Sequence, residues 1–249
     1  MIKILTNSNL FKLYYMYNKL KSLIPILLIF GFTIVITYYS SEWMTYNLYR
    51  INDKPEILIM PDFYDKNDFE KIENIVYEKN KHLKYDTRMS ERKTYLFKKQ
   101  SNKYKDLYDL LYNDKFISTT DKYINYNKKE LRKQQINSFP IEYRKYDKNS
   151  IGMDWHKDLA LFDGEPYYEC ALTVSNNSES YFEYINREGY KEKIYTKPNM
   201  LICVMPNIVP HYVSPTKSGE REILKFIATF DNNEPNENYI KEINGNKYF

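Results

Sequence analysis

The tetrapeptide Trp155-His156-Lys157-Asp158 separates a histidine from a carboxylate by one residue. At the end of a strand, side chains two residues apart point to the same side, so both can reach one ion. A second histidine, His211, opens a later apolar run that is predicted to be a strand. Two histidines and one carboxylate are the facial ligand set of non-haem Fe(II) sites, which leaves three positions open. The pattern therefore predicts a metal site at His156, Asp158 and His211.

Arg221 adds a second constraint, because it follows His211 by ten residues, after the turn Lys217-Ser-Gly219. A guanidinium binds a carboxylate through two parallel hydrogen bonds, so it suits the far end of a dicarboxylic acid. One hairpin would then bind a metal through His211 and such an acid through Arg221. The remaining histidine, His82, lies in a charged stretch and is predicted to be solvated.

The soluble part of the sequence shows helical patterns first and short strands later. Helices are predicted after the apolar run 57–60, with apolar faces from Phe69 to Val76, Tyr104 to Leu111 and Phe116 to Ile124. Strands are predicted at 134–146, 169–175, 180–186, 192–196, 200–205, 209–213 and 221–230, with turn residues between them. This order indicates the α+β class: a double-sheet jelly roll, or double-stranded β-helix, with supporting N-terminal helices.

Residues 22–41 carry no charge and are mostly apolar. A helix rises about 1.5 Å per residue, so roughly 20 such residues suffice to cross a bilayer. Tyr38, Tyr39 and Trp43 stand at its end, as interfacial aromatics do. A cleaved signal peptide and a buried core helix are the alternatives, but bulky tyrosines occupy the candidate cleavage positions. The sequence favours a transmembrane signal-anchor that precedes the jelly roll.

The flanking charges predict the orientation of this segment. Four lysines and no acidic residue precede it, whereas residues 42–56 mix both signs. By the positive-inside rule, residues 1–21 form a cytosolic tail, residues 42–56 a linker, and residues 57–249 a lumenal domain. The expected arrangement is single-pass type II, in the endoplasmic reticulum or secretory pathway.

Composition limits the partners of the chain. The net charge of +4 is dispersed, and no basic face is strong enough to predict nucleic-acid binding. The Lys-rich stretches 91–105 and 121–133 are predicted to be solvated helix and loop faces. Trp155 is expected to pack at a strand end, with a place in a substrate channel as the alternative.

These motifs resemble the 2-oxoglutarate/Fe(II)-dependent dioxygenase superfamily and, within it, the prolyl 4-hydroxylase-like group. The shared pattern is a tyrosine before His-x-Asp, then a distal histidine, then Arg or Lys. The chain supplies Tyr146, His156 with Asp158, His211 and Arg221 in that order. Residues 57–63 resemble the first strand of the group, and the resemblance extends to about residue 230. One departure is the turn 176–180, Asn-Asn-Ser-Glu-Ser, where the group carries more glycine.

The resemblance implies that His156, Asp158 and His211 bind Fe(II) and that Arg221 holds the C5 carboxylate of 2-oxoglutarate. It assigns Tyr146 a hydrogen bond to the same carboxylate, a role for which Tyr143 competes. 2-Oxoglutarate and O₂ are the implied co-substrates, ascorbate is an optional reductant, and no catalytic side chain beyond the metal ligands is implied. The family topology would place Cys170 and Cys203 on neighbouring inner strands; buried free thiols are expected there, and a cross-strand disulfide is the alternative.

Three functions compete on this basis. The resemblance favours an enzyme, a 2-oxoglutarate-dependent dioxygenase that hydroxylates a side chain of a peptide or protein, proline first. Hydroxylation of lysyl residues or of a free small molecule is the second hypothesis. The third is a membrane-tethered jelly-roll binding module that has lost its metal. That module predicts a degraded triad, yet all three ligands and Arg221 are present.

Overall fold

The computed structural model describes Lys21, Thr33 and residues 55–86, 92–98, 102–124, 134–135, 139–164, 166–230 and 233–245. The chain divides into residues 1–53 and 54–249, and nearly all described residues belong to the second unit. Within the described residues, no helix is both long enough and apolar enough to cross a membrane. The predicted anchor at 22–41, apart from Thr33, lies outside them, as does most of the predicted linker.

Two antiparallel sheets form the second unit. The larger has the order β1-β11-β8-β13-β5-β3-β2, with β4 paired to β13, and the smaller has the order β10-β9-β12-β6. The larger sheet comprises β1 (Ile57–Met60), β2 (Lys84–Asp86), β3 (Arg92–Phe97), β4 (Gln134–Gln135), β5 (Ile141–Tyr146), β8 (Tyr168–Asn176), β11 (Leu201–Val204) and β13 (Arg221–Phe230). The smaller comprises β6 (Met153–His156), β9 (Phe182–Ile185), β10 (Lys191–Ile194) and β12 (His211–Val213). The chain alternates between the sheets, which confirms the predicted jelly roll.

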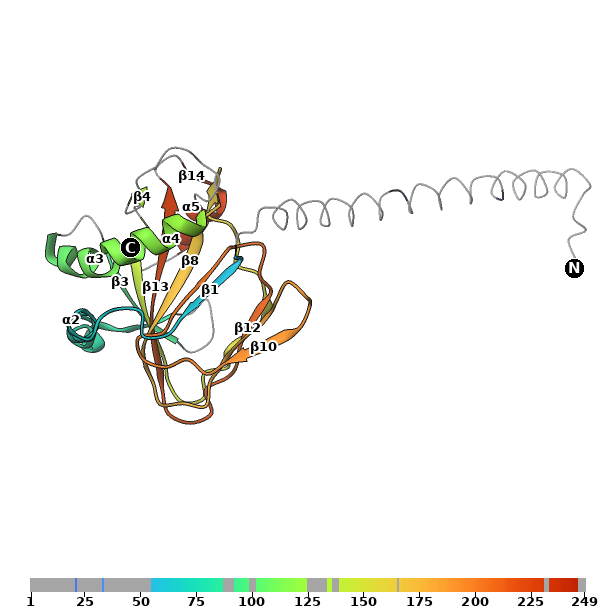
Figure 1. The fold of residues 1–249 in the computed structure, drawn as a ribbon. Helices are drawn as coiled ribbons and strands as arrows, with labels where there is room; N and C mark the ends of the chain where they lie inside the picture. Colours follow the sequence, from blue (N-terminus) through green and yellow to red (C-terminus); the bar gives the residue numbers. More distant parts are fainter. Residues whose placement is uncertain are drawn as a thin grey trace, which may run out of the picture. The chain divides into compact units, whose positions relative to one another are not determined.

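Helices cover the outer face of the larger sheet, on the side away from β10 and β12 (Figure 1). They are α2 (Lys66–Tyr77), α3 (Lys105–Leu111) and α4 (Asp114–Ile124), while α5 (Glu237–Gly245) follows the short pair β7 (Phe162–Asp163) and β14 (Glu234–Pro235). The Asp65 side chain accepts a hydrogen bond of 2.9 Å from Asp68 N and so caps α2. Phe116 of α4 packs against Phe226 of β13 at 5.3 Å between ring centroids. This packing fixes β13, the strand that carries Arg221.

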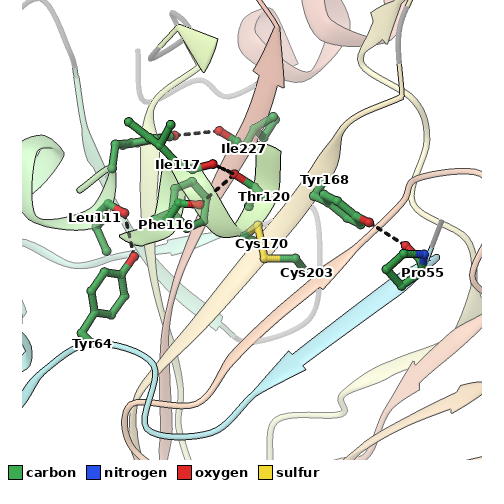
Figure 2. Close-up of a disulfide and its surroundings, with 11 residues drawn as sticks. Pro55, Tyr64, Leu111, Phe116, Ile117, Thr120, Tyr168, Cys170, Cys203 and Ile227 are labelled. Carbon is green, nitrogen blue, oxygen red and sulfur yellow. Dashed lines mark hydrogen bonds between the residues drawn. A yellow bond between two sulfur atoms is a disulfide. The ribbon is translucent and has the colours of Figure 1, made fainter. Parts of the chain in front are cut away.

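A disulfide joins β8 and β11 beneath α4 (Figure 2). Cys170 and Cys203 are direct partners in the register of these strands, with their Cα atoms 4.0 Å apart. Both side chains are fully buried in the core between the sheet and the helices. The expectation of free thiols is therefore wrong, because the register places the two sulfur atoms opposite each other on one face of the sheet.

Strand β3 corrects the interpretation of residues 91–105 as solvated. Arg92 opens β3, is only 2% exposed, and pairs with Tyr146 of β5. Alternation along β3 directs Arg92 toward the interior between the sheets, where other polar groups lie. From the sequence alone, a strand with basic residues resembles a surface segment, which is why the burial of Arg92 was not predicted. The predicted strand 134–146 is also divided, into β4 and β5.

Gly152 allows β6 to approach β12. Its φ is +76°, in the left-handed region, and a Cβ added there would lie 2.3 Å from the carbonyl oxygen of Val213. Glycine is the residue that adopts this conformation without a steric penalty and lets backbones come this close. The close approach positions β6, which ends at His156, beside β12.

Candidate metal centre

Strands β6 and β12 bring the two predicted metal-binding histidines together. His156 ends β6, His211 begins β12, and the two residues are direct partners in the antiparallel register. Asp158, just beyond β6, places Oδ1 3.7 Å from His156 Nε2 and Oδ2 3.8 Å from His211 Nε2. An ion with bonds of about 2.1 Å can hold two ligand atoms that are up to about 4.2 Å apart. The three side chains can therefore share one metal ion.

Backbone carbonyl groups orient both imidazole rings. His156 Nδ1 lies 2.6 Å from the oxygen of Asp154, and His211 Nδ1 lies 3.0 Å from the oxygen of Val209. Each contact assigns the Nδ1–H tautomer and leaves Nε2 with its lone pair toward Asp158. His156 Nε2 is buried and has no hydrogen-bond partner within the described ranges. A metal ion would satisfy that atom.

The electrostatics of Asp158 and His211 match what a metal requires. Burial would raise the pKa of Asp158, but Lys225 and the two histidines hold it well below its usual value. The carboxylate is therefore ionised. Burial lowers the pKa of His211, which keeps that imidazole neutral and able to bind a metal.

Arg221 and Tyr146 lie side by side on the inner face of the larger sheet. They are direct partners on β13 and β5, and the Arg221 guanidinium carbon is 4.5 Å from the centroid of the Tyr146 ring. Arg221 is 4% exposed, and its Nε has no hydrogen-bond partner in the part of the chain that the structure describes. Although burial opposes the change, Arg92, Arg144 and Arg221 lower the pKa of Tyr146 to about 8. This end of the interior is strongly cationic and suits a carboxylate.

Tyr143, the competing tyrosine, lies on the other face of β5. Its hydroxyl donates a hydrogen bond of 2.5 Å to Asn80 Oδ1, and its ring belongs to the helix-covered core. Residues 143 and 146 differ by an odd number of positions, so alternation sends their side chains to opposite faces. Of the two tyrosines, the structure brings Tyr146 to Arg221.

One interior cavity joins the two ends of the site. Arg221 and Tyr146 line it together with Asp158 and His211. Its remaining walls are mostly apolar: Met153, Phe182, Ile202, Val204, Val213 and Ile223. A dicarboxylic acid could thus contact the cationic end and the metal ligands at once, while the apolar walls exclude water.

Lys225 and Glu169 also line this cavity, and sequence reasoning missed both. A signal for Lys225 was present, because it lies four residues after Arg221 on the same strand and alternation returns it to the same face. Trp155 is 38% exposed and stacks on Tyr212 at 5.8 Å between ring centroids, so it both packs at a strand end and faces outward. His82 is exposed, away from this cavity.

No family model matches the sequence, and no curated protein matches it. Solved structures match the fold. A Trichoplax adhaerens prolyl hydroxylase, in complex with a peptide of the hypoxia inducible factor oxygen degradation domain, is 14% identical, with a TM-score of 0.56 over 78% of this chain and 92% of that one. HygX from Streptomyces hygroscopicus, with nickel, 2-oxoglutarate and hygromycin B bound, is 12% identical, with a TM-score of 0.51 over 74% and 86%. An oxidoreductase of the 2OG-Fe(II) oxygenase family from Burkholderia pseudomallei is 9% identical, with a TM-score of 0.52 over 70% and 84%.

The chain has the 2-oxoglutarate/Fe(II) oxygenase fold. Within this oxygenase fold, His156, Asp158 and His211 form a facial triad with the geometry given above. The residues present fit both groups that the fold implies. His156 Nε2, which has no hydrogen-bond partner among the described residues, and the ionised Asp158 suit Fe(II), and the buried Arg221 guanidinium suits the far carboxylate of 2-oxoglutarate.

Proposed function

We propose that this domain is a Fe(II)- and 2-oxoglutarate-dependent dioxygenase that hydroxylates a peptidyl side chain, proline first. The observation that carries the proposal is that Asp158 and His211, two members of a triad that could share one metal ion, line one interior cavity together with Arg221. When bound, the metal and co-substrate supply the oxidation: one atom of O₂ enters a substrate C–H bond, and the other enters succinate, which forms together with CO₂.

The residues of the chain divide the remaining work. His156, Asp158 and His211 would hold the metal, and a site with three protein ligands would leave room for the co-substrate and O₂. Arg221 donates to the far carboxylate, and the Tyr146 hydroxyl donates to the same group. Binding at both ends fixes the co-substrate before the substrate C–H bond arrives, which is the contribution that positioning makes to rate.

The surface around the triad supports an extended substrate. Two depressions share His156 and Lys157; one continues past Trp155 and Lys191, and the other past Leu159. Leu159 is 65% exposed and Trp155 38%. A peptide that passed the metal could occupy both depressions, whereas small-molecule sites bury most of their ligand in one concave pocket. The Trichoplax enzyme of the same fold binds a peptide, which also favours this substrate class.

We expect proline-containing peptides to stimulate succinate release from the loaded enzyme and to gain one oxygen atom by mass spectrometry. Trp155→Ala should raise the KM for the peptide by about tenfold, because a partly exposed aromatic anchor contributes on the order of 1–2 kcal/mol at an interface. The control is Tyr85→Ala, an exposed tyrosine on β2, with no expected change. If small molecules or lysyl peptides stimulate succinate release and proline peptides do not, the proposed proline substrate is wrong and those compounds are the better candidates.

We further propose that residues 22–41 anchor the domain in a membrane and that residues 57–249 lie on the lumenal side. The buried Cys170–Cys203 disulfide supports an oxidising compartment, where such bonds persist. In sealed microsomes that contain the full chain, both cysteines should resist alkylation until reduced, and the domain should resist added protease. Reduction should destabilise the domain by about 2–4 kcal/mol, measured by denaturant unfolding. Free thiols together with a protease-sensitive domain would place it in the cytosol.

A further inference from the structure

Lys225 and Glu169 form an ion pair beside the metal-binding carboxylate. The Lys225 ammonium lies 2.6 Å from Glu169 Oε2 and 3.8 Å from Asp158 Oδ1. The Lys225 and Glu169 side chains are 19% and 2% exposed. Lys225 comes from β13 and Glu169 from β8, two neighbouring strands of the larger sheet, so the pair is held by the sheet itself.

Stability alone is a poor explanation for this pair. Burying an ion costs several kcal/mol, and replacing a buried ion pair with apolar residues is often neutral or stabilising. Apolar residues fit the same face of β13, because Ile223 and Ile227 flank Lys225 there and are 9% and 1% exposed. Burial raises the pKa of Glu169 to about 7 even with Lys225 beside it. Burial therefore disfavours the charge of Glu169, whereas Asp158 and Glu169 raise the pKa of Lys225 despite its burial and keep it charged.

The metal centre offers a specific role. Backbone carbonyls orient His156 and His211, as described above, and Asn207 N donates a hydrogen bond of 2.7 Å to the main-chain oxygen of Asp158. These contacts fix both rings and the Asp158 backbone, but they leave the rotation of its carboxylate open. Among the described lysine and arginine residues, Lys225 is the one that lies within 4 Å of this carboxylate. Partners of metal ligands typically change metal affinity or activity by 10- to 100-fold.

We propose that Lys225 is a positioning residue that fixes the Asp158 carboxylate for metal binding, and that Glu169 in turn fixes Lys225. This inference rests on the proposed function, because it assigns a role at the same metal centre. The series of contacts from Asp158 to Lys225 to Glu169 would then orient the carboxylate ligand, as the backbone carbonyl groups orient the two histidines.

The test is titration of the metal-free protein with Co(II), followed through the visible spectrum of the bound ion. At a pH above 7, where Glu169 is ionised, K225M/E169Q removes the pair without changing the net charge, so a change in affinity cannot arise from a change in net charge. We expect its affinity for Co(II) to fall 10- to 100-fold, with an altered spectrum, because the carboxylate loses its orientation. The single variant K225R should keep most of the wild-type affinity for Co(II), because it keeps a cation beside Asp158.

The matched control is K145M/E222Q. Lys145 and Glu222 form an ion pair of 3.0 Å between β5 and β13 on the opposite face of the same sheet, with similar exposure of 17% and 4%. This control should leave the affinity for Co(II) unchanged.

K225Q serves if the double variant does not fold. It removes the cation beside Asp158 and keeps Glu169 in place, so charge alone predicts tighter Co(II) binding, whereas loss of positioning predicts weaker binding. Affinity equal to the wild type in K225M/E169Q, or tighter binding in K225Q, overturns the inference while the proposed function stands. A wild-type protein that binds no Co(II) overturns the proposed function itself.

Discussion

His211→Ala is expected to abolish turnover of 2-oxoglutarate, with a loss of about 1000-fold or more in kcat/KM. That loss corresponds to about 4 kcal/mol of transition-state stabilisation, because each tenfold change is about 1.4 kcal/mol. His211 is 5% exposed, is the direct β-sheet partner of His156, and carries the nitrogen that lies 3.8 Å from Asp158. Without it, two protein ligands remain, and the metal is no longer held at three positions on one side.

Two measurements check this prediction. The first is succinate release; the second is the visible charge-transfer band that forms when Fe(II) and 2-oxoglutarate are added without O₂. Both should disappear in His211→Ala and persist in His82→Ala, which removes the exposed histidine. Retention of the band in a folded His211→Ala sample would show that the metal is bound elsewhere. Absence of the band in a folded wild-type sample would leave the non-catalytic binding module as the better account.

The metal ligands could be predicted from sequence because their pattern is local and their chemistry is restrictive. His156 and Asp158 lie on one short segment, and of the three histidines in the chain only His82 lies outside the predicted ligand set. The jelly roll was predictable for a similar reason, since strands of alternating or continuous apolar residues follow one another with turn residues between them. The β13 prediction agrees with the structure at both ends.

Interior polar residues were harder to predict, because their signal depends on which face of a strand is inside. Tyr143 and Tyr146 could not be separated until the sheet showed that one faces the helices and the other faces Arg221. Arg92 and Lys225 look like surface residues by type. They face inward because strand alternation places them between the sheets, where other charged side chains such as Asp158 and Glu169 lie. The Cys170–Cys203 disulfide likewise depends on the exact register of β8 and β11, which spacing in the sequence does not specify.

Arg221→Met is expected to weaken 2-oxoglutarate binding on the order of 100-fold while leaving metal affinity unchanged. A charge-assisted hydrogen bond contributes about 1.5–3 kcal/mol, and the guanidinium can offer two to one carboxylate. The buried Nε of Arg221, unpartnered within the described residues, is available for this contact. The measurement is a titration of the anaerobic Fe(II) protein with 2-oxoglutarate, followed by the charge-transfer band, beside a Co(II) titration without co-substrate.

Arg144→Met is the matched comparison, because Arg144 lines the same cavity but already donates from Nε to Glu142 Oε2 at 2.7 Å. Because Glu142 neutralises the charge of Arg144, the loss of Arg144 should weaken 2-oxoglutarate binding much less than the loss of Arg221. Arg221→Lys should fall between them, since it keeps the charge but loses the planar fork. If Arg144→Met has the larger effect instead, the acid lies along β5 and the assignment of Arg221 is wrong. If neither substitution weakens 2-oxoglutarate binding, the cationic end of the cavity binds another ligand, and only the assignment of the metal ligands stands.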